Sequence, residues 1–228
     1  MVRLERLTEA WRRMSKTFEQ FVSEVVEQGS VPAHLLYEAG MYQLSNDLEG
    51  IVKVLQDAGI RFEVVGGVAV NAHIFTKDRS RSFVTRDIDV LLQRTDLERV
   101  SKAAEAHGYV ARKMMGGYML IRPDQKAGEA VHILFVGEKS KSTQSFPHPD
   151  LHPEEKHLFG LTVPVAPLKD LLQMKLTSFR PRDVAHLEIL DELGLITPVI
   201  EGHLPSILKE RLAEARKQIT ASKPDVEG

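Results

Sequence analysis

Two aspartates separated by a single residue carry the clearest chemical signal in this sequence. Asp87 and Asp89 lie in a segment over 85–91 whose apolar residues alternate as in a strand, and residues two apart on a strand face the same side. Two neighbouring carboxylates repel each other unless a cation neutralises them, and their oxygen ligands suit Mg²⁺. The alternative is an exposed acidic strand edge with Asp87 at its start, and the segment alone favours neither.

The second chemical signal is a pair of glycines between a predicted strand over 61–65 and a predicted short helix over 68–75. Gly66 and Gly67 would let the backbone approach a ligand closely. Amide groups at the start of the helix would then favour an anion such as phosphate. A tight strand-to-helix turn with no ligand would use the same residues, so the pair by itself is a weak signal.

The elements that must position these residues follow from hydrophobic periodicity and from turn residues. Strands are predicted over 61–65, 87–93, 109–114, 118–122, 130–136 and 161–165. Helices are predicted over 3–28, 33–58 (with a break near Gly40), 68–75, 96–107, 167–179, 182–193 and 202–220, and a long loop over 137–160.

Strands that are connected both by helices and by a hairpin predict an α+β fold, with a mixed sheet flanked by helices. We expect an N-terminal helical annex over 1–59, a core over 60–166 and a C-terminal helical region over 167–228. The apolar stripe over 4–25 fits either an intramolecular core or a homodimer surface.

Composition excludes several classes of protein. The chain has 43% hydrophobic and 27% charged residues, which is ordinary for a globular domain, and its net charge of −2 argues against a general nucleic-acid coat but not against a local basic groove. The absence of cysteine excludes disulfides and thiolate zinc sites. With no signal peptide and no apolar run of roughly 20 residues, we expect a cytoplasmic protein without a membrane partner.

Taken together, the two motifs resemble the nucleotidyltransferase superfamily with a polymerase-beta-like fold, and in particular its minimal and abortive-infection (AbiEii-like toxin) branches. Those proteins have a strand, a glycine pair, a small-residue helix and then a Thr-x-Asp-x-Asp strand. The residues that match this pattern here are Gly66, Gly67, Ala69, His73, Thr85, Asp87 and Asp89. The resemblance resumes at 167–175 and 180–183, and it spans about 60–193.

The resemblance implies a role for each matched residue. Asp87 and Asp89 would hold Mg²⁺ or Mn²⁺, and His132 and Lys175 would be further catalytic candidates. The implied nucleotide-binding residues are Gly66, Gly67, Thr85, Lys175, Arg180 and Arg182. The glycine turn would cradle the triphosphate, Lys175 would offset its charge, and an arginine could contact phosphate or acceptor.

The sequence also departs from the family pattern. Active members place a third carboxylate on a later core strand, where this chain has His132; a histidine can act as a general base or ligate a metal, but it brings no negative charge. Glu129 would face the other side of a regular strand. Phe83 stands where an arginine is common, and His186 where an acidic residue often follows the Arg-Asp pair.

Two hypotheses therefore stay open. The first is a metal-dependent transfer of a nucleoside monophosphate from a nucleoside triphosphate to an RNA end, a protein or a small molecule, as in a toxin with an antitoxin partner. The second is a catalytically inert binding or regulatory module, antitoxin-like or dimerising, which His132 motivates. The sequence identifies neither the base nor the acceptor.

Two further clusters are weaker candidates. His148, His152 and His157 lie in the predicted loop over 137–160 and could bind a transition metal, but their spacing matches no common ligand set, and a solvated loop is favoured. The basic loop over 77–86 could grip phosphate or an RNA end, or it could be a surface loop without a ligand.

Overall fold

The computed structural model of the chain describes residues 33–114, 116–123, 125 and 129–222. The helix predicted over 3–28 lies outside these residues. The strands are β1 (Phe62–Val65), β2 (Ile88–Leu92), β3 (Val110–Met114), β4 (Gly117–Ile121), β5 (Val131–Phe135), β6 (Glu154–Leu158) and β7 (Leu161–Val165). The helices are α3 (Ala33–Asp57), α4 (Gly66–Ile74), α5 (Leu97–Glu105), α6 (Leu168–Ser178), α7 (Pro181–Glu192), α8 (Pro198–Gly202) and α9 (Ser206–Ser222), with short 3₁₀ turns at Arg79–Arg81 and Arg94–Asp96.

The strands form one mixed sheet in the order β3-β4-β5-β2-β1-β7-β6. The pairs β2–β5 and β1–β7 are parallel, and the remaining pairs are antiparallel. The prediction of an α+β fold with a mixed sheet flanked by helices is confirmed.

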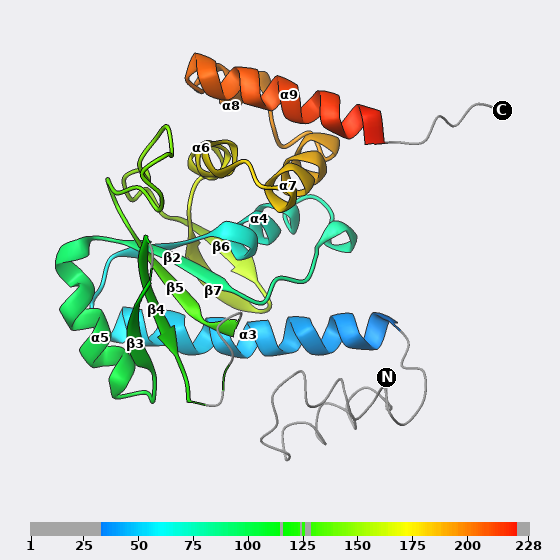
Figure 1. Ribbon diagram of the computed structural model, residues 1–228. Helices are drawn as coiled ribbons and strands as arrows, with labels where there is room; N and C mark the ends of the chain where they lie inside the picture. The colour runs from blue at the N-terminus through cyan, green and yellow to red at the C-terminus, as the bar shows by residue number, and fades with distance from the viewer. Residues whose placement is uncertain (1–32, 115, 124, 126–128, 223–228) are drawn as a thin grey trace.

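The two faces of the sheet carry different residues because successive side chains of a strand point to opposite sides. On one face, Val64, Val90 and Ile133 are fully buried with Leu48 and Ile51 of α3 in the main hydrophobic core. Helix α3 runs along this side of the sheet, whereas α4, α6 and α7 lie on the other side, toward the C-terminal helices (Figure 1). The face toward α4 and α6 is the one that carries Asp89.

A second apolar cluster joins the C-terminal helices to α4. Val70 and Ile74 of α4 are fully buried with residues of α6, α7 and α9, among them Leu172, Leu190 and Leu208. The helices that cover the site are therefore packed on the same short helix that begins at the glycine pair. The division at 59 and 166 stays a prediction.

Three local expectations were wrong. Helix α3 continues through Gly40 without a break, and α4 begins at Gly66 itself. The segment expected as a loop over 137–160 contains β6, a polar edge strand that pairs with β7. Its sequence has no apolar alternation because an edge strand with charged side chains buries little, and the pairing partner decides its conformation.

The described residues include no helix that is both long and apolar enough to cross a bilayer.

Candidate functional site

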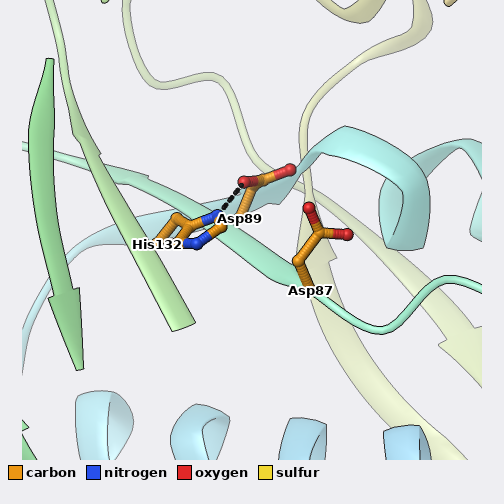
Figure 2. A group of neighbouring side chains, drawn as sticks. All are labelled: Asp87, Asp89 and His132. Carbon is orange, nitrogen blue, oxygen red and sulfur yellow. Dashed lines mark hydrogen bonds and ion pairs between the residues drawn. The ribbon is translucent and has the colours of Figure 1, made fainter. Parts of the chain in front are cut away.

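Asp89 and His132 lie side by side because β2 and β5 pair in parallel. The register places Asp89 opposite His132 and Ile88 opposite Val131, so Asp89 and His132 point to the same face of the sheet. Asp87 lies one residue before β2 and faces the same side. One ligand atom from each of Asp87, Asp89 and His132 lies within 4.8 Å of the others, and Figure 2 shows the three side chains gathered at this point.

The Asp89 carboxylate and the His132 imidazole interact directly. His132 Nδ1 lies 3.2 Å from Asp89 Oδ1, and each side chain is 20% exposed. The contact with Asp89 raises the pKa of His132. Burial works against ionisation of Asp89, but the hydrogen bond and charge of His132, with Lys175 and Arg182, hold its pKa below the usual value. In the absence of a metal ion, the site thus favours an ionised Asp89 carboxylate that accepts a hydrogen bond from the His132 imidazole.

The glycine pair is required by the position of the acidic residues. Gly66 has a φ of +68°, and a Cβ there would lie 2.0 Å from Asp89 Oδ2. A Cβ on Gly67 would lie 2.9 Å from Thr85 Oγ1, and Thr85 Oγ1 donates to Asp87 Oδ1 over 2.8 Å. The N-cap of α4 is Val65, whose side chain provides no cap, so no capping side chain competes with an anion for the first amides of the helix.

Lys175 reaches the site from α6 and is held by a buried ion pair. Its Nζ lies 3.1 Å from Asp183 Oδ1, with side chains 7% and 0% exposed. Burial lowers the pKa of Lys175 despite this partner. Asp183 also accepts bonds from Ser178 Oγ and from the backbone and side chain of Arg180; burial opposes its ionisation, but Lys175, Ser178 and Arg180 lower its pKa to about 2.

Arg182 reaches the acidic pair from α7. Its Nη1 is 3.5 Å from Asp87 Oδ2, and its side chain is half exposed. Arg180 is also about half exposed. Both arginines therefore present much of their guanidinium groups to solvent next to the carboxylates.

All of these residues line one cleft with a volume of about 970 Å³. It is bounded by the ends of β1, β2 and β5, the start of α4, helices α6 and α7, the β3–β4 turn and the segment over 140–148. Six of its lining residues are basic, and three are acidic, although the whole chain has a net charge of −2. The basic residues are Arg86, Lys141, Lys175, Arg180, Arg182 and Arg211, and the acidic residues are Asp87, Asp89 and Asp183.

The nine residues to which the resemblance assigned a metal-binding, catalytic or nucleotide-binding role all line this cleft. Two residues that shape it were not singled out from the sequence. Asn71 is fully buried on α4, accepts from the backbone N–H of Phe83 over 3.1 Å and donates to its carbonyl over 2.7 Å. Asn71 thereby fixes the end of the basic loop. Asp183 was noted only as part of the motif over 180–183, without a role of its own. Its place in the first turn of a helix that begins at Pro181 was the feature of the sequence that could have identified it.

His186 closes the cleft beside Phe83. The two rings stack with centroids 4.2 Å apart and planes at 17°. Burial and the charge of Lys175 lower the pKa of His186 to about 3, so the ring is neutral. One stacked pair of rings thus occupies positions 83 and 186, where the resemblance led us to expect charged residues.

The loop histidines do not form a metal site. His148 is buried between the Phe135 carbonyl and the Ser140 hydroxyl, so the expectation of a solvated loop was wrong for this residue. His152 lies beside Asp170, and His157 contacts Thr162. In the part of the chain that the structure describes, Asp87, Asp89 and His132 are the group of acidic and imidazole side chains close enough to share an ion.

Comparisons with known proteins bear on the family. A family model described as uncharacterised nucleotidyltransferase matches residues 8–189. No curated protein sequence matches the chain.

Solved structures resemble the fold only distantly. The antibiotic-resistance factor ANT(2'')-Ia is 13% identical, with 77% of this chain and 84% of that chain covered and a TM-score of 0.42. The Megavirus polyadenylate synthase is 15% identical, with 78% and 37% covered and a TM-score of 0.48. A tRNA nucleotidyltransferase complexed with a primer tRNA and an incoming ATP analog is 15% identical, with 74% and 50% covered and a TM-score of 0.33.

Proposed function

Because the chain belongs to the family of uncharacterised nucleotidyltransferases, we propose that it transfers a nucleoside monophosphate from a nucleoside triphosphate to a hydroxyl group, with a divalent metal ion bound at Asp87, Asp89 and His132. The observation that carries the proposal is the position of these side chains against the Gly66–Gly67 turn. A Cβ at Gly66 would meet the Asp89 carboxylate at 2.0 Å, so the backbone amides of α4 and the proposed metal ligands lie at the same point.

The donor set fits a divalent ion. Two carboxylates and an imidazole lie within 4.8 Å of one another and open into the cleft, and carboxylates commonly hold Mg²⁺ or Mn²⁺ together with substrate phosphates. When bound, such an ion would neutralise phosphate charge and polarise the reacting phosphoryl group.

The protein's own groups would then bind and orient the triphosphate. The first amides of α4, without a capping side chain, would donate to phosphate oxygens. Thr85 would keep Asp87 in place through its hydroxyl. Lys175, fixed by Asp183, would offset phosphate charge, and the exposed guanidinium groups of Arg180 and Arg182 would contact phosphate or acceptor as paired donors.

The reaction balances without a further reagent. The oxygen of the acceptor hydroxyl bonds to the α-phosphorus, the bond from the α-phosphorus to the bridging oxygen breaks, pyrophosphate leaves with that electron pair, and the hydroxyl proton passes to solvent water. An RNA end, a protein hydroxyl and a small molecule all supply this group, and the excess of basic residues in the cleft favours an acceptor that itself carries negative charge. An AbiEii-like toxin role, an antitoxin partner, a homodimer and a cytoplasmic location stay predictions.

Calorimetric titration with each of the four nucleoside triphosphates tests the proposal, in the presence of Mg²⁺ and then of Mn²⁺. We expect metal-dependent binding by the wild type and its loss in Asp87→Ala/Asp89→Ala. Asp57→Ala, at an exposed aspartate at the end of α3, is the matched control and should bind normally. No binding of any triphosphate by the wild type would favour the inert module instead.

A further inference from the structure

We infer that His132 is a direct metal ligand and that it makes the site select a transition-metal ion, with Mn²⁺ as the ion that fits, over Mg²⁺. The inference rests on the proposed function, because it concerns the ion of the same site. It goes beyond that function by assigning the identity of the ion to a single residue of this chain.

The sheet register places His132 where a ligand is needed. Its partner across the parallel pair is Asp89, and Nδ1 lies 3.2 Å from Asp89 Oδ1. The backbone of His132 cannot slip along the sheet, since a shift of one residue in this register would turn His132 to the opposite face. That face is filled by Val131 and Ile133, which are almost fully buried. The register thus fixes the side of the sheet, and the place beside Asp89, from which the imidazole reaches the site.

Among the residues that the structure describes, no further carboxylate is in a position to replace this nitrogen. Glu129 lines a separate small cavity with Asp47 and Arg86 rather than the cleft. Asp183 lies in the cleft, but its two oxygens are engaged by Lys175, Ser178 and Arg180. Within the described residues, the donor set is therefore two carboxylates and one imidazole.

This donor set discriminates between ions. Mg²⁺ takes oxygen ligands in octahedral geometry and dehydrates reluctantly. Imidazole binds first-row transition-metal ions better than it binds Mg²⁺, and among these ions Mn²⁺ is the one that carboxylate and water oxygens suit. An ion held by Asp87, Asp89 and His132 and completed by triphosphate oxygens meets the preferences of Mn²⁺, whereas for Mg²⁺ the nitrogen replaces a preferred oxygen.

Electron paramagnetic resonance of bound Mn²⁺ tests the inference without any measurement of turnover. We expect Mn²⁺ to bind the full chain at pH 8 and to show magnetic coupling to a ligand ¹⁴N nucleus. When histidine alone is labelled with ¹⁵N, this coupling should change to that of ¹⁵N, a result that requires no variant to fold. His186→Phe removes another imidazole that lines the cleft and should leave the coupling intact.

The variant His132→Asp tests selectivity. It should lose the nitrogen coupling, and its preference for Mn²⁺ over Mg²⁺ should fall by at least about 10-fold, because even the outer-shell partners of metal ligands contribute about 10- to 100-fold to affinity. Mn²⁺ that binds without nitrogen coupling, while triphosphate binding still depends on Asp87 and Asp89, would overturn the inference and leave the proposed function standing. Absence of both metal and triphosphate binding would overturn the two together.

Discussion

The replacement Gly66→Ala separates backbone strain from damage to the acidic site, because the chain offers a matched control. Gly66 has a φ of +68°, and Gly59 has a φ of +63°. A Cβ on Gly66 would lie 2.0 Å from Asp89 Oδ2, whereas a Cβ on Gly59 would have nothing within 4 Å. The two replacements therefore share the strain and differ in what the new methyl group meets.

The expected magnitudes follow from this geometry. A non-glycine residue in the left-handed conformation costs about 1–2 kcal/mol, so both variants should lose that much free energy of unfolding. Since Cβ atoms essentially never come within 3.0 Å of a heavy atom outside their own residue and its chain neighbours, Gly66→Ala must also displace the Asp89 carboxylate by about 1 Å. Displacement of a ligand should weaken metal binding by at least about 10-fold, and Gly59→Ala should not weaken it.

Urea unfolding gives the first quantity, and titration with Mn²⁺ followed by a nucleoside triphosphate gives the second. Equal metal affinity in Gly66→Ala and Gly59→Ala, at equal stability, would refute the reasoning: the Asp89 carboxylate would then either have room to move without consequence or have no part in metal binding.

Three further predictions concern buried titratable groups. Burial raises the pKa of Glu63 to about 7 from 4.5, so the folded state favours the protonated acid. The free energy of unfolding should therefore fall by roughly 3 kcal/mol as the pH rises from 4 to 8. In urea titrations, Glu63→Gln should flatten this fall. Asp183→Asn leaves Lys175 buried without its partner and should cost about 3–5 kcal/mol; if adding Lys175→Met to it did not recover much of that loss in unfolding experiments, the ion pair would not be the cause. The pKa of His186 is lowered to about 3 from 6.5, so stability should decrease as the pH falls below 6.5. His186→Phe, which preserves the stack on Phe83, should remove this decrease. If the melting temperature of the variant fell with acid pH as steeply as that of the wild type, this prediction would be contradicted.

Glu63 and His186 oppose each other in their effect on stability. The first favours acidic pH, because its protonated form is the buried one, and the second favours pH above 6.5, because its neutral form is the buried one. Their opposite effects should nearly cancel between about pH 4.5 and 6.5, so these two groups together place the stability maximum in this mildly acidic range. The single variants should move this maximum in opposite directions.

The distribution of charge in the cleft also follows from where the elements meet. Helices α6 and α7 bring Lys175, Arg180 and Arg182 to the carboxylates, so that a chain with a net charge of −2 has a cleft with more basic than acidic residues. A net charge of −2 is compatible with a local basic groove. The basic residues that form it come from segments up to about half the chain apart, and composition alone could not locate it.

Local sequence was sufficient for the parts of the site that depend on short-range geometry. The alternation around Asp87 and Asp89 placed both carboxylates on one side, and the glycine pair marked the start of a helix after a buried strand, because strand periodicity and glycine's freedom at positive φ act over a few residues. Most strands and helices were likewise located within a few residues. Two predictions failed. The break expected at Gly40 does not occur, because α3 packs its buried face on the sheet and continues through this residue. The strand β6 was not predicted, because an edge strand of this kind has no apolar pattern.

The tertiary structure decided everything that joins distant segments. The parallel register of β2 and β5 sets His132 against Asp89, 43 residues earlier. The packing of α6 and α7 on α4 buries the Lys175–Asp183 pair at the edge of the cleft, and the Phe83–His186 stack joins the basic loop to α7. Periodicity in the chain specifies which face of an element is apolar, but it does not specify which neighbour that face will meet. The burial of the whole core selects that neighbour. It thereby also determines which side chains lie beside Asp87 and Asp89.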